Sequence, residues 1–98
     1  ESDIRKAVES YLAMSDNQRL QYKTPKSLLG QPVVPFHYLR RKLRLLAAFK
    51  NDRRGVARSL EESIKDMVKA EILRQVPAQQ ALEKFGVTTE LYVKGPTW

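Results

Sequence analysis

The sequence predicts a mainly α-helical domain that ends in a small β-hairpin. Apolar residues recur at spacings of three and four through most of the first 70 residues, which is the pattern of amphipathic helices. Two short segments near the C-terminus then change to a strand-like pattern. A chain of 98 residues supports one core of modest size, so we expect a single domain over residues 1–98.

The first helix is predicted over residues 3–14, where Ser2 or Asp3 can cap its start. Its apolar face consists of Ile4, Ala7, Val8, Tyr11 and Leu12. Residues 15–17 offer a loop or a new helix cap, and residues 18–23 fit a weak helical turn as well as a short extended segment.

A second, short helix is predicted over residues 25–29. Thr24 is a preferred cap, Pro25 suits a first helical position, and Gly30 suits the helix end. The prolines that follow, Pro32 and Pro35, disfavour helical conformations in the residues before them. Residues 31–34 are therefore expected to be extended.

The longest apolar stripe predicts a central helix over residues 35–49. This stripe consists of Phe36, Leu39, Leu43, Leu46 and Ala47, and Tyr38, Leu45 and Phe49 widen it. The remaining face carries His37, Arg40, Arg41 and Arg44, again at helical spacing. We therefore expect three arginines on one solvent-exposed face.

A polar turn that ends at Gly55 separates this helix from the next, predicted over residues 56–70. The strands of the hairpin are predicted over residues 72–76 and 90–94, ended by Pro77 and by Gly95-Pro96. A loop over residues 77–89 connects them, and its first half can form a helical turn that Gly86 terminates.

The chain is basic, and its excess charge lies in one segment. The formal net charge is +7, and the segment from Arg40 to Arg58 contains eight basic residues and one acidic residue. The rest of the chain contains ten of each, so its charges cancel. Such concentration is typical of a surface that binds a polyanion, and nucleic acid is the leading candidate. An acidic protein and an anionic membrane surface are the alternatives.

The order of elements resembles that of the winged helix-turn-helix family. Residues 59–76 are similar to the stretch in which a recognition helix ends and the first wing strand begins, and Tyr92 and Val93 are similar to the returning strand. The resemblance covers about residues 24–94. Two features differ from many members: Ala70-Glu71 stands where a glycine is common, and the loop over residues 77–89 is longer than a simple wing.

The resemblance implies that the helix over residues 56–70 lies in the major groove of double-stranded DNA. For contacts to the DNA backbone it implies Arg40, Arg41, Arg44, Lys50 and Arg53. For base contacts it implies Arg54, Arg58, Ser59 and Lys65. In a second register of the same fold, the helix over residues 35–49 enters the groove with His37, Arg40, Arg41 and Arg44, and Glu61-Glu62 favours this register because carboxylates repel phosphate.

Catalytic and metal sites find no support in the sequence. There is no cysteine, His37 is the single histidine, and no glycine-rich phosphate loop is present. Glu61 and Glu62 are adjacent, so on a helix they point about 100° apart and make a poor acid–base pair. We expect no enzymatic activity, cofactor, metal or small-molecule ligand.

The sequence thus predicts sequence-specific binding of double-stranded DNA by a transcriptional regulator or a DNA-maintenance protein. A homodimer is expected, and the apolar first helix is a candidate for its contact. Trp98 is expected either to be a disordered end or to pack on the domain or on a partner subunit. The alternatives are a module that docks an acidic protein and an RNA-binding domain. We expect a cytoplasmic location, or association with the nucleoid if the protein is bacterial. The longest apolar run, residues 45–49, is far shorter than the roughly 20 residues that span a membrane. The first residue is Glu, which indicates a trimmed chain or a fragment.

Overall fold

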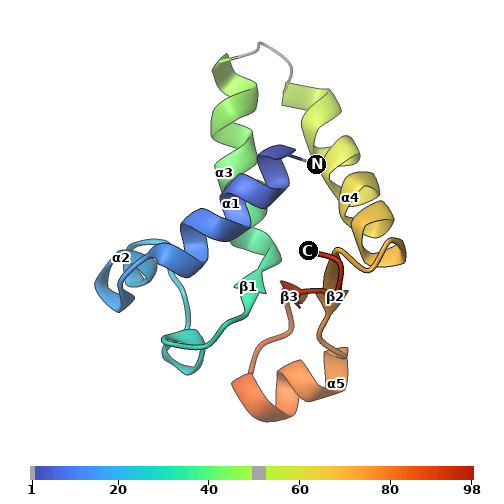
Figure 1. Ribbon diagram of the computed structural model, residues 1–98. Helices are drawn as coiled ribbons and strands as arrows, with labels where there is room; N and C mark the ends of the chain where they lie inside the picture. Colours follow the sequence, from blue (N-terminus) through green and yellow to red (C-terminus); the bar gives the residue numbers. More distant parts are fainter. Residues whose placement is uncertain (1, 50–52) are drawn as a thin grey trace.

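The computed structural model describes residues 2–49 and 53–98, and of residues 46–49 and 53–59 it describes the backbone alone. The chain is mainly α-helical with a small antiparallel sheet (Figure 1). The helical elements are α1 (Ser2–Ala13), α2 (Asp16–Gln21), the 3₁₀ turn η1 (Lys26–Leu28), α3 (Phe36–Phe49), α4 (Arg53–Lys69), α5 (Ala78–Gln80) and the π-helical turn η2 (Ala81–Phe85). The strands are β1 (Val34–Pro35), β2 (Leu73–Gln75) and β3 (Leu91–Lys94).

The three long predicted helices are present as α1, α3 and α4, with small shifts at their ends. The largest shift is at the start of α4, which begins at Arg53 rather than at residue 56. Gly55 therefore lies inside the first turn of α4 instead of ending a turn, so that prediction was wrong. A glycine costs a helix only about 1 kcal/mol, which the packing of a 17-residue helix overrides.

The ambiguous segment after α1 forms a helix, α2. Ser15 caps it, since the Ser15 side chain accepts a hydrogen bond from the Gln18 amide at 3.3 Å. The Gln18 Oε1 atom accepts one from the Ser15 amide at 2.9 Å in return. This reciprocal capping box is visible in the sequence as Ser-x-x-Gln, and it is the signal that favours helix over strand here.

The short helix expected over residues 25–29 is reduced to the 3₁₀ turn η1, and the extended segment after it holds an unpredicted strand, β1. Strand β1 pairs antiparallel with β3, with Val34 opposite Tyr92 and Pro35 opposite Leu91. A proline lacks the amide proton that a central strand needs, so it suits this edge position. The partner strand lies more than 50 residues away in the sequence, which is why local patterns did not reveal β1.

The sheet has the order β1-β3-β2, with β3 in the centre. Strands β2 and β3 form the predicted hairpin, paired from Leu73 opposite Lys94 to Gln75 opposite Tyr92. The predicted loop over residues 77–89 is not an open wing, because α5 and η2 fill its first part. Two apolar side chains of η2 complete a small second core, which consists of Leu28, Val33, Ala81, Phe85 and Leu91. Gly86 ends η2 in the left-handed conformation, as its position predicted.

The main core lies between α1, α3, α4 and the inner side of the sheet. The apolar face of α1 belongs to this core, since Ile4, Ala7, Val8 and Tyr11 are each at most 3% exposed. This face is therefore not available as the dimer contact for which it was a candidate, and the homodimer itself stays a prediction. A small domain has few large apolar side chains, and here those of α1 are needed to cover α3.

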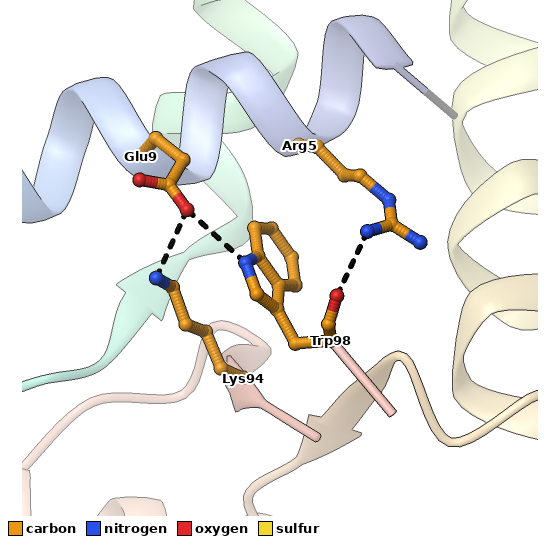
Figure 2. Close-up of polar contacts among 4 residues, drawn as sticks. All are labelled: Arg5, Glu9, Lys94 and Trp98. Atoms are coloured by element: carbon orange, nitrogen blue, oxygen red, sulfur yellow. Dashed lines mark hydrogen bonds and ion pairs between the residues drawn. The ribbon is translucent and has the colours of Figure 1, made fainter. Parts of the chain in front are cut away.

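The C-terminal tail packs on the domain, so of the alternatives for Trp98 the structure shows the intramolecular one. Figure 2 shows the indole beside α1, where its Nε1 atom donates a hydrogen bond to Glu9 Oε1 at 3.1 Å. Lys94 Nζ lies 2.9 Å from the same oxygen, and Arg5 donates a hydrogen bond to the Trp98 carbonyl oxygen at 2.9 Å. The hydrogen bonds from Lys94 and Trp98, together with the charge of Lys94, lower the pKa of Glu9.

Candidate nucleic-acid interface

Helix α3 divides cleanly into a buried and a basic face. Tyr38, Leu39 and Leu43 are buried in the core, while Arg40, Arg41 and Arg44 are exposed. A repeat of 3.6 residues per turn places these three arginines within one stripe on the side away from the core. This α3 arginine stripe (Arg40, Arg41 and Arg44) confirms the face that the sequence predicted.

One arginine of the stripe is held in place by an aromatic side chain. The Arg41 guanidinium lies 5.4 Å from the centre of the Tyr22 ring, within the range of a cation–π contact. Tyr22 in turn meets Tyr38 edge-on, with ring centres 5.1 Å apart. Arg41 therefore contacts the core through Tyr22, the residue that follows α2, which sequence reasoning did not assign to the site.

His37 lies on the same face as the stripe but is half-buried. Burial and the positive charge of Arg40 lower the pKa of His37, and a hydrogen bond with the Tyr22 backbone opposes that shift in part. An imidazole whose pKa lies below its usual value is mostly neutral at pH 7, so His37 adds little positive charge to this face. The electrostatic attraction of the described part of α3 for an anion rests on its arginines and Lys42.

Lys65, a predicted base contact, has different neighbours. It is exposed on the second half of α4, where it lines a groove together with Glu61 and Glu90. No member of the α3 arginine stripe lines that groove. Between residues 60 and 69 the charged side chains are Glu61, Glu62, Lys65, Asp66 and Lys69, so this half of the helix is not basic. The structure thus brings Lys65 together with carboxylates rather than with the arginines.

The other predicted contacts belong to the junction between α3 and α4. Lys50 lies outside the described residues. Arg53, Arg54, Arg58 and Ser59 lie in the first half of α4, and their side chains are outside the described part. Figure 1 shows the last turn of α3 and the first turn of α4 together at the end of the molecule remote from α5. The backbone therefore places the start of α4, which carries Arg53 and Arg54, beside the end of α3 at one pole of the fold.

A further arginine, Arg19, is excluded from any such surface by burial. It is 8% exposed, and its Nε and Nη2 atoms donate hydrogen bonds to the Met14 carbonyl oxygen at 3.3 and 3.1 Å. Its guanidinium also lies 5.4 Å from the centre of the Tyr11 ring. Arg19 therefore fastens α2 to the end of α1 and does not serve a ligand.

Other kinds of site are not seen in the parts of the chain that the structure describes. None of the described helices combines the length and the apolar character needed to cross a bilayer. Among the described side chains, no three histidine, aspartate or glutamate residues gather as a metal ion would require. In the comparisons with known proteins, no protein-family model matches the chain, and neither a curated protein nor a solved structure is significantly similar to it.

Proposed function

We propose that this chain is a winged helix-turn-helix domain that binds double-stranded DNA in a sequence-specific manner. The observation that carries the proposal is the segregation of charge: a net +7 lies between Arg40 and Arg58, in two helices whose adjacent ends meet at one pole. Three of these arginines form an exposed stripe on α3. Neutralisation of DNA phosphates by such a surface releases counterions and drives binding.

The arrangement of the elements supports the fold assignment within this proposal. Helices α3 and α4 are separated by three residues, and the antiparallel pair β2–β3 follows α4 directly. Glu71, at the position where many family members have glycine, has a φ of 60°. That left-handed backbone conformation is one that glycine adopts without steric cost, which supports the correspondence of Glu71 with the glycine of other members.

The elements before α3 favour α4 as the recognition helix. The second register requires a helix over residues 25–29 and a simple turn before α3. In their place the structure has the 3₁₀ turn η1 and the strand β1, which is tied into the sheet. In the preferred register the first turn of α4 presents its free amides to the DNA, with Arg54, Arg58 and Ser59 nearest the bases, while the α3 arginine stripe contacts phosphates.

Replacement of Arg40 or Arg44 by alanine is expected to weaken binding to all duplex sequences alike. Each change removes a phosphate contact, so the slope of log affinity against log salt should fall by about one per variant. Fluorescence anisotropy with a labelled duplex at several salt concentrations measures both quantities. Lys26→Ala, which removes an exposed cation on η1, is the matched control and should leave the slope unchanged.

Affinity that does not change in the Arg40 and Arg44 variants would rule out this face. Selection from a random duplex pool, followed by sequencing, tests specificity independently. An enriched motif supports sequence-specific reading, and an inverted repeat adds a symmetric dimer to the proposal. Retention without a motif would contradict specificity. Absence of retention would contradict DNA binding and leave RNA or an acidic protein as the partner.

Replacement of Arg58 by alanine is expected to relax specificity at one base position by about 1–3 kcal/mol, because an arginine can pair with guanine at two points. The measurement compares affinities for the selected site and for its single-base variants. If discrimination changes with His37→Ala or Arg41→Ala and not with Arg58→Ala, α3 is the recognition helix and the preferred register is wrong.

A transcriptional regulator or a protein of DNA replication or partition fits this proposal. Both classes need a small domain that finds one site among many, which depends on the ratio of specific to non-specific affinity. The genomic positions of the selected motif would distinguish a transcriptional regulator from a protein of replication or partition.

A further inference from the structure

A groove of about 360 Å³ lies between the second half of α4 and the sheet. Its lining consists of Phe36, Glu61, Ile64, Lys65, Val68, Gln75, Glu90 and Tyr92. The apolar members are buried or half-buried and form the floor, whereas the charged members and the glutamine are exposed and form the rim. The groove therefore combines an apolar, aromatic base with a charged mouth.

Two carboxylates from different elements line this mouth. Glu61 is on α4 and Glu90 directly precedes β3, and the charges of both act on Tyr92. Burial, then the charge of Glu90, then that of Glu61 raise the pKa of Tyr92 to about 12, so the phenol stays protonated at neutral pH. Among the described side chains, neither carboxylate accepts a hydrogen bond or pairs with a cation, although Lys65 shares the groove.

These features match the chemistry of an arginine side chain. The floor offers apolar surface to the methylene stem, and the rings of Phe36 and Tyr92 suit the flat face of a guanidinium. The guanidinium carries five donors, which can serve two carboxylates at once. A lysine fits less well, because its compact ammonium is more strongly hydrated and lacks the planar fork.

The chain itself presents suitable arginines. Arg40 and Arg44 are exposed on α3, four residues apart on the same side of the helix, and neither lines the groove of its own chain. Among the described side chains, neither is paired with a carboxylate. The apolar face of α1 is buried in the core, so it is not available for self-association. We propose that the groove binds an arginine of the α3 stripe of a second copy of this chain, which makes the free protein self-associate through Glu61 and Glu90.

This inference goes beyond the proposed function and does not depend on it. If DNA uses the same arginines, however, DNA and the groove of a second copy compete for them. Duplex DNA would then dissociate the self-associated form. The equilibrium of DNA binding and that of self-association would be coupled by mass action. The acidic groove would act as an internal substitute for phosphate.

Sedimentation equilibrium over a wide range of protein concentration tests the inference. The decisive variants exchange the charges of the proposed pair, by Glu61→Arg and Arg44→Glu. The wild-type average mass is expected to rise above the 11.3 kDa of one chain as concentration increases. Glu61→Arg alone and Arg44→Glu alone should each associate more weakly than the wild type, because each places like charges in contact. The two changes combined in one chain should restore association. Glu62→Arg, an exposed glutamate on α4 outside the groove lining, is the matched control and should associate like the wild type.

Wild-type protein that stays monomeric throughout, or a combined variant that does not recover, would overturn the inference. The neutral pair Glu61→Gln with Glu90→Gln gives the same test with less risk to folding, and it should be monomeric with an unchanged circular dichroism spectrum. If the wild type is monomeric, n-butylguanidinium can be titrated against it while nuclear magnetic resonance shifts of the groove residues are recorded. Shifts at those residues would assign the groove to an arginine of another protein and reject the second copy.

The two proposals fail separately. The neutral pair retains the α3 arginine stripe and loses two negative charges, so it should bind DNA at least as tightly as the wild type while losing self-association. If the charge exchange restores association but no duplex DNA binds to any variant, the proposed function fails and this inference stands. If DNA binds and association never occurs, the reverse holds.

Discussion

Replacement of Leu43 by alanine is expected to lower the free energy of unfolding by about 2–5 kcal/mol. Leu43 is 8% exposed and lies in the core between α1, α3 and α4, so its removal leaves a cavity that the surrounding helices fill only in part. In a domain of this size, such a loss lowers the melting temperature by roughly 10–30 °C and removes much of the total stability. Thermal and urea unfolding followed by circular dichroism measures it.

The same helix offers a matched control in Leu45, which is 55% exposed. Leu45→Ala deletes the same atoms from solvent-exposed surface, and alanine is the better helix former, so stability should change by less than about 0.5 kcal/mol. A melting temperature for Leu43→Ala within a degree or two of the wild type would show that Leu43 is not part of the core. Equal losses in the two variants would show that α3 is rotated relative to the described fold.

Replacement of Gly95 by alanine is expected to cost about 3 kcal/mol, at the upper end for overpacking. A Cβ atom at this position would overlap the carbonyl oxygen of Glu71, which is main chain and cannot rotate away as a side chain can. The Gly95 amide donates a hydrogen bond to the Ile72 carbonyl oxygen at 2.8 Å, and this contact would be lost as the segments separate. The change should therefore release the C-terminal tail as well as destabilise the fold.

The single tryptophan, Trp98, reports on this release directly. In Gly95→Ala its fluorescence emission should shift to longer wavelength, as the indole leaves α1 and enters water, at temperatures where the helical signal is still intact. The control is Gly86→Ala: an alanine there adopts a strained positive φ of 65° in open space, which should cost about 1–2 kcal/mol without changing Trp98 emission. Unchanged emission in Gly95→Ala would contradict the described contact between the tail and the turn at Glu71.

The local elements of the fold were predictable where periodicity is long and unbroken. Helices α1, α3 and α4 follow apolar stripes of three or four turns, and the hairpin follows from two short segments bounded by proline and glycine. Shorter elements were harder to predict. The Ser15–Gln18 capping box was available as a signal for α2, whereas β1 is two residues long and exists because β3 lies beside it. A strand of that length is specified by its partner rather than by its own residues.

The candidate site was predictable in part, for an electrostatic reason. Charge and helical spacing are properties of the sequence, so the α3 arginine stripe follows from the sequence alone. The partners of those charges are set by packing: Tyr22 contacts Arg41, burial lowers the pKa of His37, and Lys65 shares a groove with Glu61 and Glu90. Glu61 and Lys65 are one helical turn apart on α4, whereas Tyr22 and Arg41, and Lys65 and Glu90, are distant in the sequence.

The sequence by itself determined where the helices run, which of their faces are apolar and where the excess charge lies, because these depend on spacings of three and four residues within one segment. Only the tertiary structure decided which apolar faces remain available. The face of α1 could have met a second copy, but it is needed to cover α3 in a core that 98 residues can barely fill. The groove between α4 and the sheet likewise exists because residues from α3, α4, β2 and β3 converge there, which no local pattern encodes.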